Sequence, residues 1–195
     1  MPSSGADTEG TRERLFVAVE LPGAVLEELE RAAEVLRTSI GPGRWTPSTN
    51  RHVTVKFLGW VWPRLVPWIL QEIELVARTE SAFVARPAGL GTFPPGRRRA
   101  RVLWAGFEDP HAGFARLAAG LDVSMAREFE PEKRAFTAHV TLARFDPPVE
   151  PPVAFPTVAS EPFTVDHVAL FRSHLRRPAP VYERLASFPL GPPAQ

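Results

Sequence analysis

The sequence contains no cysteine and no apolar run long enough to cross a bilayer. The absence of cysteine excludes disulfides, a thiol nucleophile and thiolate metal ligands, and it is typical of a cytoplasmic protein. A membrane-spanning helix needs about 18 or more apolar residues, so we expect no membrane span. Residues 1–12 lack the basic start and apolar stretch of a signal peptide, and we interpret them as a disordered leader.

Lysine is also scarce, because only Lys56 and Lys133 contribute to the 23 basic side chains. Arginine supplies the other basic side chains, and its planar guanidinium suits bidentate contacts with phosphate. A biased genomic base composition explains the same excess of arginine. The net charge of +1 does not by itself indicate a nucleic-acid-binding protein.

Apolar periodicity predicts an α+β protein in which strands and helices are interspersed. We expect strands at 14–21, 51–58, 83–87, 101–107, 137–145, 163–173 and 181–188, and helices at 23–40, 63–78 and 110–127. Glycine, proline and arginine predict loops at 89–99 and 147–162. We expect one bilobal domain over 13–190 and a tail over 191–195, a size that allows two lobes with a shared core.

Two segments, RHVTVKF and AHVTLARF, nearly repeat each other, and both patterns are typical of strands. Side chains alternate along a strand, so His52 shares a face with Thr54, and His139 shares a face with Thr141. Histidine donates or accepts a proton near neutral pH, and a threonine hydroxyl donates hydrogen bonds to anions. This duplicated pair of residues indicates proton transfer and anion binding at a phosphorus atom.

The order of these and other segments resembles the 2H phosphoesterase superfamily, and within it the RNA 2′,3′-cyclic phosphodiesterases, also called 2′-5′ RNA ligases. The similar segments are RLFVAVELP, HVTVKFLG, GLGTFP, RVLWAG, HVTLARF and FTVDHVALFRS…YERLASFPL, within residues 14–190. Ala138 stands where the family commonly has proline, and valine replaces a commoner leucine in both motifs. The resemblance implies two antiparallel sheets that flank a central cleft, with helices on the outside.

The resemblance also implies an activity, the hydrolysis of RNA 2′,3′-cyclic phosphate ends to a 2′-phosphate, with reverse 2′-5′ ligation as a side reaction. It implies that His52 protonates the leaving oxygen and that His139 takes a proton from water, although the repeat alone leaves these roles interchangeable. Thr54, Thr141 and Arg144 are expected to bind the phosphate. We expect no metal, cofactor or membrane partner, and a monomer.

The alternation of strand side chains leaves two positions open. It places Arg144 on the face opposite His139, unless a β-bulge or the end of the strand intervenes. The same alternation places Lys56 beside His52, although the simpler interpretation is that the Lys56 side chain is solvated.

Several aromatic and basic residues have two readings. Trp104 lies in an apolar strand and is expected in the core, whereas Trp45 is the better candidate to stack on a base at the rim of the cleft. Phe57 and Phe145 are expected to pack where their strands end. The run Arg97-Arg98-Arg99 either follows an RNA backbone or forms a solvated loop.

Two alternative functions remain at this point. One keeps the enzyme class and changes the substrate to a small cyclic nucleotide or an ADP-ribose cyclic phosphate. The other is an RNA-end binding module without catalysis, against which the intact motifs count. The remaining histidines lack the motif context and are expected to be structural or surface residues: His111, His167 and His174.

Overall fold

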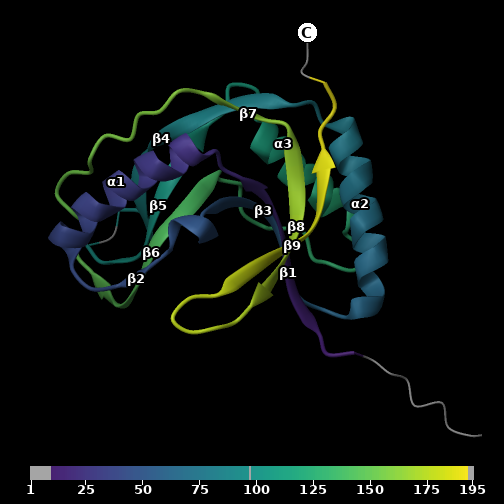
Figure 1. The fold of residues 1–195 in the computed structure, drawn as a ribbon, viewed down its shortest axis with the longest axis horizontal. Helices are drawn as coiled ribbons and strands as arrows, with labels where there is room; N and C mark the ends of the chain where they lie inside the picture. The colour runs from purple at the N-terminus through teal and green to yellow at the C-terminus, as the bar shows by residue number, and fades with distance from the viewer. Residues whose placement is uncertain (1–9, 97, 193–195) are drawn as a thin grey trace, which may run out of the picture.

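The computed structural model describes residues 10–96 and 98–192, which form two antiparallel sheets and three α-helices (Figure 1). The strands are β1 (Glu13–Glu20), β2 (Arg44–Trp45), β3 (His52–Val61), β4 (Phe83–Phe93), β5 (Ala100–Glu108), β6 (His139–Val149), β7 (Phe163–Val165), β8 (His167–His174) and β9 (Val181–Pro189). The helices are α1 (Gly23–Ile40), α2 (Val66–Thr79) and α3 (Gly113–Ser124), with 3₁₀ turns at Ser48–Asn50 and Pro63–Leu65.

The strand order is β3-β1-β8-β9 in one sheet and β2-β6-β5-β4-β7 in the other. Helix α1 packs against β6 of the five-stranded sheet, whereas α2 and α3 pack against strands of the four-stranded sheet and against each other. The α+β architecture with two antiparallel sheets is as expected from the sequence. No helix in the described ranges is both long and apolar enough to cross a membrane.

A single hydrophobic core joins both sheets and all three helices. Leu15, Leu29, Ile73, Leu117 and Leu142 are among its fully buried members. A second, smaller cluster lies on the other face of the four-stranded sheet, and it comprises Phe16, Ala18, Ala169 and Phe171. Strand β1 is therefore buried on both faces, which explains the continuous apolar run Leu-Phe-Val-Ala-Val in its sequence.

Three expectations about the elements are wrong. Strand β4 extends to Phe93, so part of the expected loop at 89–99 belongs to it, and Gly89 absorbs a register shift with a φ of 98°. The expected strand 163–173 is two strands, because the chain leaves the five-stranded sheet after β7 and enters the four-stranded sheet as β8. The expected loop at 147–162 begins later, because β6 continues to Val149.

Smaller differences concern the ends of elements. The third helix spans Gly113–Ser124 rather than 110–127, and the two-residue strand β2 was not expected. Residues 1–9 of the expected leader and residues 193–195 of the expected tail lie outside the described residues.

Candidate active site

Strand β1 determines which side chains of β3 share a face. Alternate β1 residues, Leu15, Val17 and Val19, point into the main core, and those between them lie on the opposite face of the sheet. Direct partners in antiparallel strands share a face. The β3 partners of the second set are His52, Thr54, Phe57 and Trp60, which therefore form what we call the β3 motif face.

A β-bulge at Val55 makes this face depart from strict alternation. Thr54 pairs with Ala18 and Lys56 pairs with the next β1 residue, Val17, so Val55 is the extra residue. Lys56 consequently points to the core face, where it is buried, forms an ion pair with Asp122 and donates a hydrogen bond of 3.2 Å to a backbone carbonyl. The expectation that Lys56 lies beside His52 or in solvent is wrong.

The same bulge brings Phe57 to the β3 motif face. Its side chain is 53% exposed, and the Arg14 guanidinium lies 4.7 Å from the ring centroid. The expectation that Phe57 packs is therefore wrong, whereas Phe145 is buried as expected. An exposed ring on this face can stack on a nucleobase.

Strand β6 has the same arrangement against β5. The β5 residues Gly106, Trp104 and Val102, which share one face of the strand, pair with His139, Thr141 and Arg144. The register shifts by one residue at Leu142, the fourth motif residue, so a bulge again lies between the third and the sixth. We call the face of β6 that carries His139, Thr141 and Arg144 the β6 motif face. Strict alternation excluded Arg144 from this face, and the bulge places Arg144 on it.

His139 is held in one tautomer by the backbone. Its Nδ1 lies 2.8 Å from the carbonyl oxygen of Thr137. A carbonyl only accepts hydrogen bonds, so Nδ1 carries the proton and the neutral ring presents an unprotonated Nε2. The ring also contacts Phe93 and Trp104 edge-on, with centroids 5.5 and 6.4 Å away.

Trp104 was expected to lie in the core. It instead lies beside His139, whose ring it contacts edge-on. It lies on the β6 motif face and stacks on Phe93 with a centroid distance of 5.2 Å. A Cβ atom at Gly91 would lie 2.4 Å from the Trp104 ring, and one at Gly106 would lie 2.9 Å away. Glycine is therefore required at both positions to let the indole lie flat against the strands.

Trp45 does not lie at the rim of the cleft. It pairs with Ala143 on the core face of β6 and packs edge-on against Phe145. The indole nitrogen is buried, so the expectation that Trp45 stacks on a base is wrong.

His52 lies in a more apolar environment. Its ring stacks on Phe16 at 4.7 Å and meets Tyr182 edge-on at 5.2 Å. Burial lowers the pKa of His52 to about 4, and this effect exceeds those of a hydrogen bond to the backbone of Asn50 and the nearby Glu20 carboxylate, which favour the protonated ring. Both motif histidines thus bind the backbone two residues upstream.

The two strands that carry the motifs lie next to each other, and Tyr182 lies beside the first motif. Strands β3 and β6 contact each other although they belong to different sheets (Figure 1). Tyr182 touches His52, and burial raises the pKa of its phenol while the charges of Arg14 and Arg144 oppose that shift. Arg144 comes from β6 and Arg14 from β1, so cations from both sheets act on the phenol of Tyr182. Sequence reasoning missed Tyr182, since nothing in the pattern around it distinguishes it.

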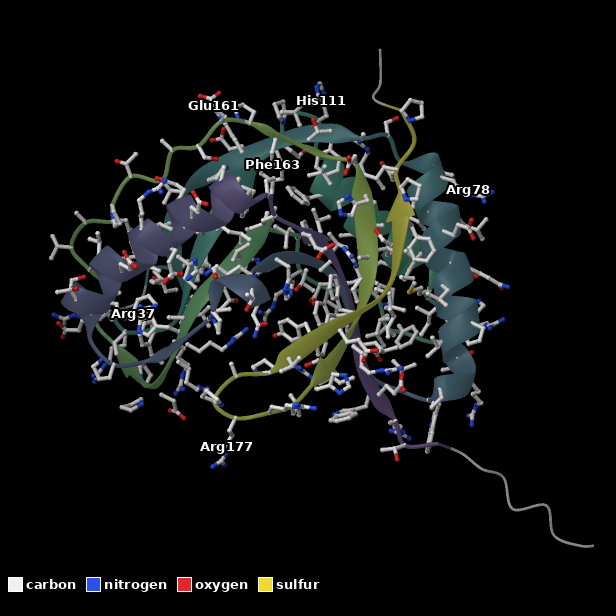
Figure 2. All side chains as sticks on the ribbon, in the orientation of Figure 1. Arg37, Arg78, His111, Glu161, Phe163 and Arg177 are labelled. Atoms are coloured by element: carbon white, nitrogen blue, oxygen red, sulfur yellow. The ribbon has the colours of Figure 1, made fainter. Side chains whose placement is uncertain are left out.

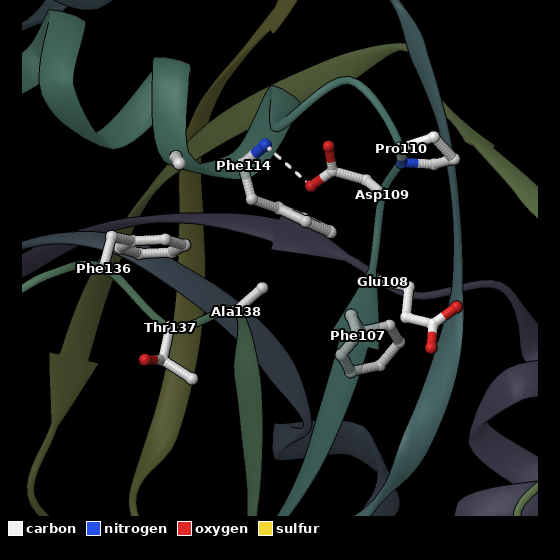
Figure 3. Close-up of a pocket in the computed structure, with 9 residues that line it drawn as sticks. Phe107, Glu108, Asp109, Pro110, Phe114, Phe136, Thr137 and Ala138 are labelled. Carbon is white, nitrogen blue, oxygen red and sulfur yellow. Dashed lines mark hydrogen bonds between the residues drawn. The ribbon is translucent and has the colours of Figure 1, made fainter.

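The cavity drawn in Figure 3 lies next to the start of β6. It has a volume of about 540 Å³ and is bounded by the end of β5, the start of α3 and residues 136–138. Asp109 caps α3 there and accepts a hydrogen bond of 3.3 Å from the Phe114 amide. Its lining includes Thr137, whose carbonyl oxygen lies 2.8 Å from the Nδ1 atom of His139.

The carboxylate beside His52 in the four-stranded sheet forms ion pairs. Glu20, the β1 partner of His52, accepts from Arg184 at 2.7 Å and lies 3.7 Å from His167. Across residues 10–96 and 98–192, no group of three or more histidine, aspartate or glutamate side chains is arranged to hold a metal ion.

A family model described as the 2′-5′ RNA ligase superfamily matches residues 14–177. The chain belongs to this superfamily. An RNA 2′,3′-cyclic phosphodiesterase of Thermus thermophilus is 35% identical over 189 residues, which cover 91% of this chain and 90% of the relative. A protein of the same description from Geobacillus stearothermophilus is 29% identical over 185 residues, and the match covers 92% of this chain but 58% of that longer protein.

Solved structures of superfamily members share the fold. The crystal structure of TT0787 of Thermus thermophilus has a TM-score of 0.78 and 34% identity, and the match covers 92% of this chain and 98% of that one. Escherichia coli LigT complexed with 3′-AMP has a TM-score of 0.74 and 26% identity, with 92% and 99% coverage. These two likenesses are consistent with the 2H phosphoesterase fold expected from the sequence.

Proposed function

We propose that this superfamily member hydrolyses RNA 2′,3′-cyclic phosphate ends to 2′-phosphate ends. The proposal is carried by the contact between β3 and β6, two strands of different sheets that each hold a motif histidine and threonine. The descriptions of the Thermus and Geobacillus relatives support the same substrate. Because one chain supplies both motifs, a monomer suffices for this site.

In the proposed mechanism, His139 accepts a proton from the attacking water. The hydrogen bond from its Nδ1 to Thr137 leaves Nε2 free for this purpose. His52 protonates the ribose 3′ oxygen as it leaves from the other side of the phosphorus atom. Attack and departure on opposite sides require the two imidazoles to flank the phosphate, which two facing strands can provide.

His52 takes up its proton from solvent when the anionic substrate binds. With a pKa of about 4, this ring is neutral near pH 7 in the free protein. A phosphate anion beside the ring favours its protonated form, and this interaction raises the pKa when the substrate binds. The apolar contacts with Phe16 and Tyr182 strengthen that interaction because they exclude water.

Three side chains are proposed to bind the phosphate. Thr54 and Thr141 donate neutral hydrogen bonds to the non-bridging oxygens, and Arg144 supplies a bidentate cationic contact. Phe57 offers its exposed ring to the terminal base. Two imidazoles suffice for both proton transfers, so we propose a metal-independent reaction. Run in reverse with an RNA 5′-hydroxyl as nucleophile, the same groups form a 2′-5′ linkage.

The first prediction concerns the two histidines. His52→Ala and His139→Ala should each lower kcat/KM on an RNA with a 2′,3′-cyclic phosphate end by about 10²–10⁴-fold, because each removes one proton transfer. His111→Ala, at the periphery of the molecule in Figure 2, is the matched control and should retain activity. Activity should survive a strong chelator, and the product end should be a 2′-phosphate. Full turnover in either motif variant contradicts the mechanism.

A substrate with a 3′-bridging sulfur separates the two roles in the same experiment. A thiolate leaves without a proton donor, so His52→Ala should recover most of its loss on this substrate. His139→Ala should not recover, because water still needs a base. Recovery of His139→Ala instead would assign the roles in the opposite sense.

A further inference from the structure

Arg44 lies on the β6 motif face, and the reaction proposed above does not use this residue. It is the direct partner of Arg144 across the β2–β6 ladder, so the two side chains share a face. Its neighbour Trp45 pairs with Ala143 and points to the core. Arg44 is exposed and belongs to the edge strand of the five-stranded sheet.

The opposition of two arginines is unfavourable without an anion. Like charges directly opposite each other in a sheet are destabilising, and within the described part of the chain neither Arg44 nor Arg144 has an ion pair with a carboxylate. Other arginines of the molecule are paired in this way. Arg51, Arg86, Arg116, Arg172 and Arg184 bind Glu30, Glu108, Glu80, Glu13 and Glu20 respectively. The motif face thus keeps two cationic groups available for a ligand.

The β8–β9 hairpin carries further uncompensated positive charge. Arg176 and Arg177 in its loop are exposed and lack ion-pair partners among the residues described, and Figure 2 shows Arg177 at the tip of this loop. The Asn50 side chain donates a hydrogen bond of 2.7 Å to the Pro180 carbonyl, which fixes this hairpin beside the β3 motif. The hairpin therefore places additional cations near the β3 motif.

We infer that Arg44 binds the phosphodiester immediately upstream of the reacting cyclic phosphate, which makes an RNA oligonucleotide the preferred substrate over a mononucleotide. The inference rests on the proposed function, in which Arg144 holds the reacting phosphate. Neighbouring strands lie about 4.8 Å apart, so Arg44 is one strand further out than Arg144. An RNA chain that passes over this edge brings its next phosphate to the Arg44 guanidinium, which suits bidentate contact.

The test compares Arg44→Gln with the wild type on two substrates, a mononucleoside 2′,3′-cyclic phosphate and a six-nucleotide RNA with the same end. The ratio of kcat/KM for the oligonucleotide to kcat/KM for the mononucleotide should fall about tenfold, since one charged hydrogen-bonding contact is lost. The slope of log kcat/KM for the oligonucleotide against log salt should weaken by about one. Arg44→Lys should restore part of the ratio and the whole salt slope.

Arg78→Gln is the matched control, because Arg78 lies on the outer side of α2, where it binds Glu74 (Figure 2). It should change neither the ratio nor the salt slope. If Arg44→Gln lowers both activities equally, or neither, the inference is wrong. If the wild type hydrolyses neither substrate, the proposed function itself fails, so the two failures are distinguishable.

Discussion

At the scale of single residues, the two motif histidines have the same sequence context and different environments. His52 stacks on Phe16 of the four-stranded sheet, whereas His139 is contacted edge-on by Phe93 and Trp104. The sequence predicted both histidines and both threonines as site residues because period-two alternation acts locally. The environments were not predictable, since Phe16 and Tyr182 reach His52 from strands far away in the sequence.

The burial of His52 has a consequence for pH dependence. The reaction needs one protonated and one neutral histidine, so kcat/KM should fall once a low pH protonates even the buried His52. The pKa of His52 is about 4, so the acid limb should have its midpoint near pH 4. The measurement is a pH–rate profile under kcat/KM conditions, with circular dichroism to verify folding. A midpoint near 6.5, the value of an unperturbed imidazole, contradicts the burial effect.

At the scale of elements, the two β-bulges decide which residues reach the site. Each lies three residues after its histidine, at Val55 and at Leu142, and turns the sixth motif position back to the motif face. A bulge depends on the register between neighbouring strands, so sequence alternation assigned Lys56 and Arg144 to the wrong faces. Phe57 follows His52 by the same number of residues as Arg144 follows His139. This shared spacing was the signal that could have placed Phe57 and Arg144 on the motif faces.

The bulge at Val55 predicts that Lys56 has a structural role. Asp122→Asn leaves the buried ammonium without its counter-charge and should lower the free energy of unfolding by about 3 kcal/mol. The kcat/KM of the folded protein should stay within about twofold of the wild type, because Lys56 lies on the core face. Urea denaturation and steady-state kinetics measure the two effects.

Glu74→Gln provides the control for this prediction, because it breaks an exposed ion pair with Arg78 on α2. Such pairs contribute about 0.5 kcal/mol or less. A large loss of kcat/KM in Asp122→Asn at unchanged stability would mean that Lys56 acts in the reaction.

At the scale of the whole molecule, one core unites the two sheets while the motif faces lie outside it. The resemblance to the 2H phosphoesterases supplied this architecture. Local patterns alone could not, because the pairing of β1 with β3 and β8, and the passage of the chain from one sheet to the other after β7, depend on contacts between distant segments. We propose on this basis that residues 13–190 are a single cooperative unit.

A single core predicts that both sheets unfold together. Native-state hydrogen exchange should give the same opening free energy for core amides of β1, in the four-stranded sheet, and of β5, in the five-stranded sheet. Leu15 and Leu103 are suitable reporters because both are fully buried. A difference of several kcal/mol between them would show that the two lobes unfold separately.

The paired bulges also make the two motif faces unlike each other. The sixth motif position is an apolar ring in one motif, Phe57, and a cation in the other, Arg144. A ligand with one flat uncharged end and one anionic end therefore enters in one orientation, although both motifs share a histidine, a threonine and a bulge. A single divergent position in each copy of a duplicated motif is enough to fix which end of a nucleotide meets which imidazole.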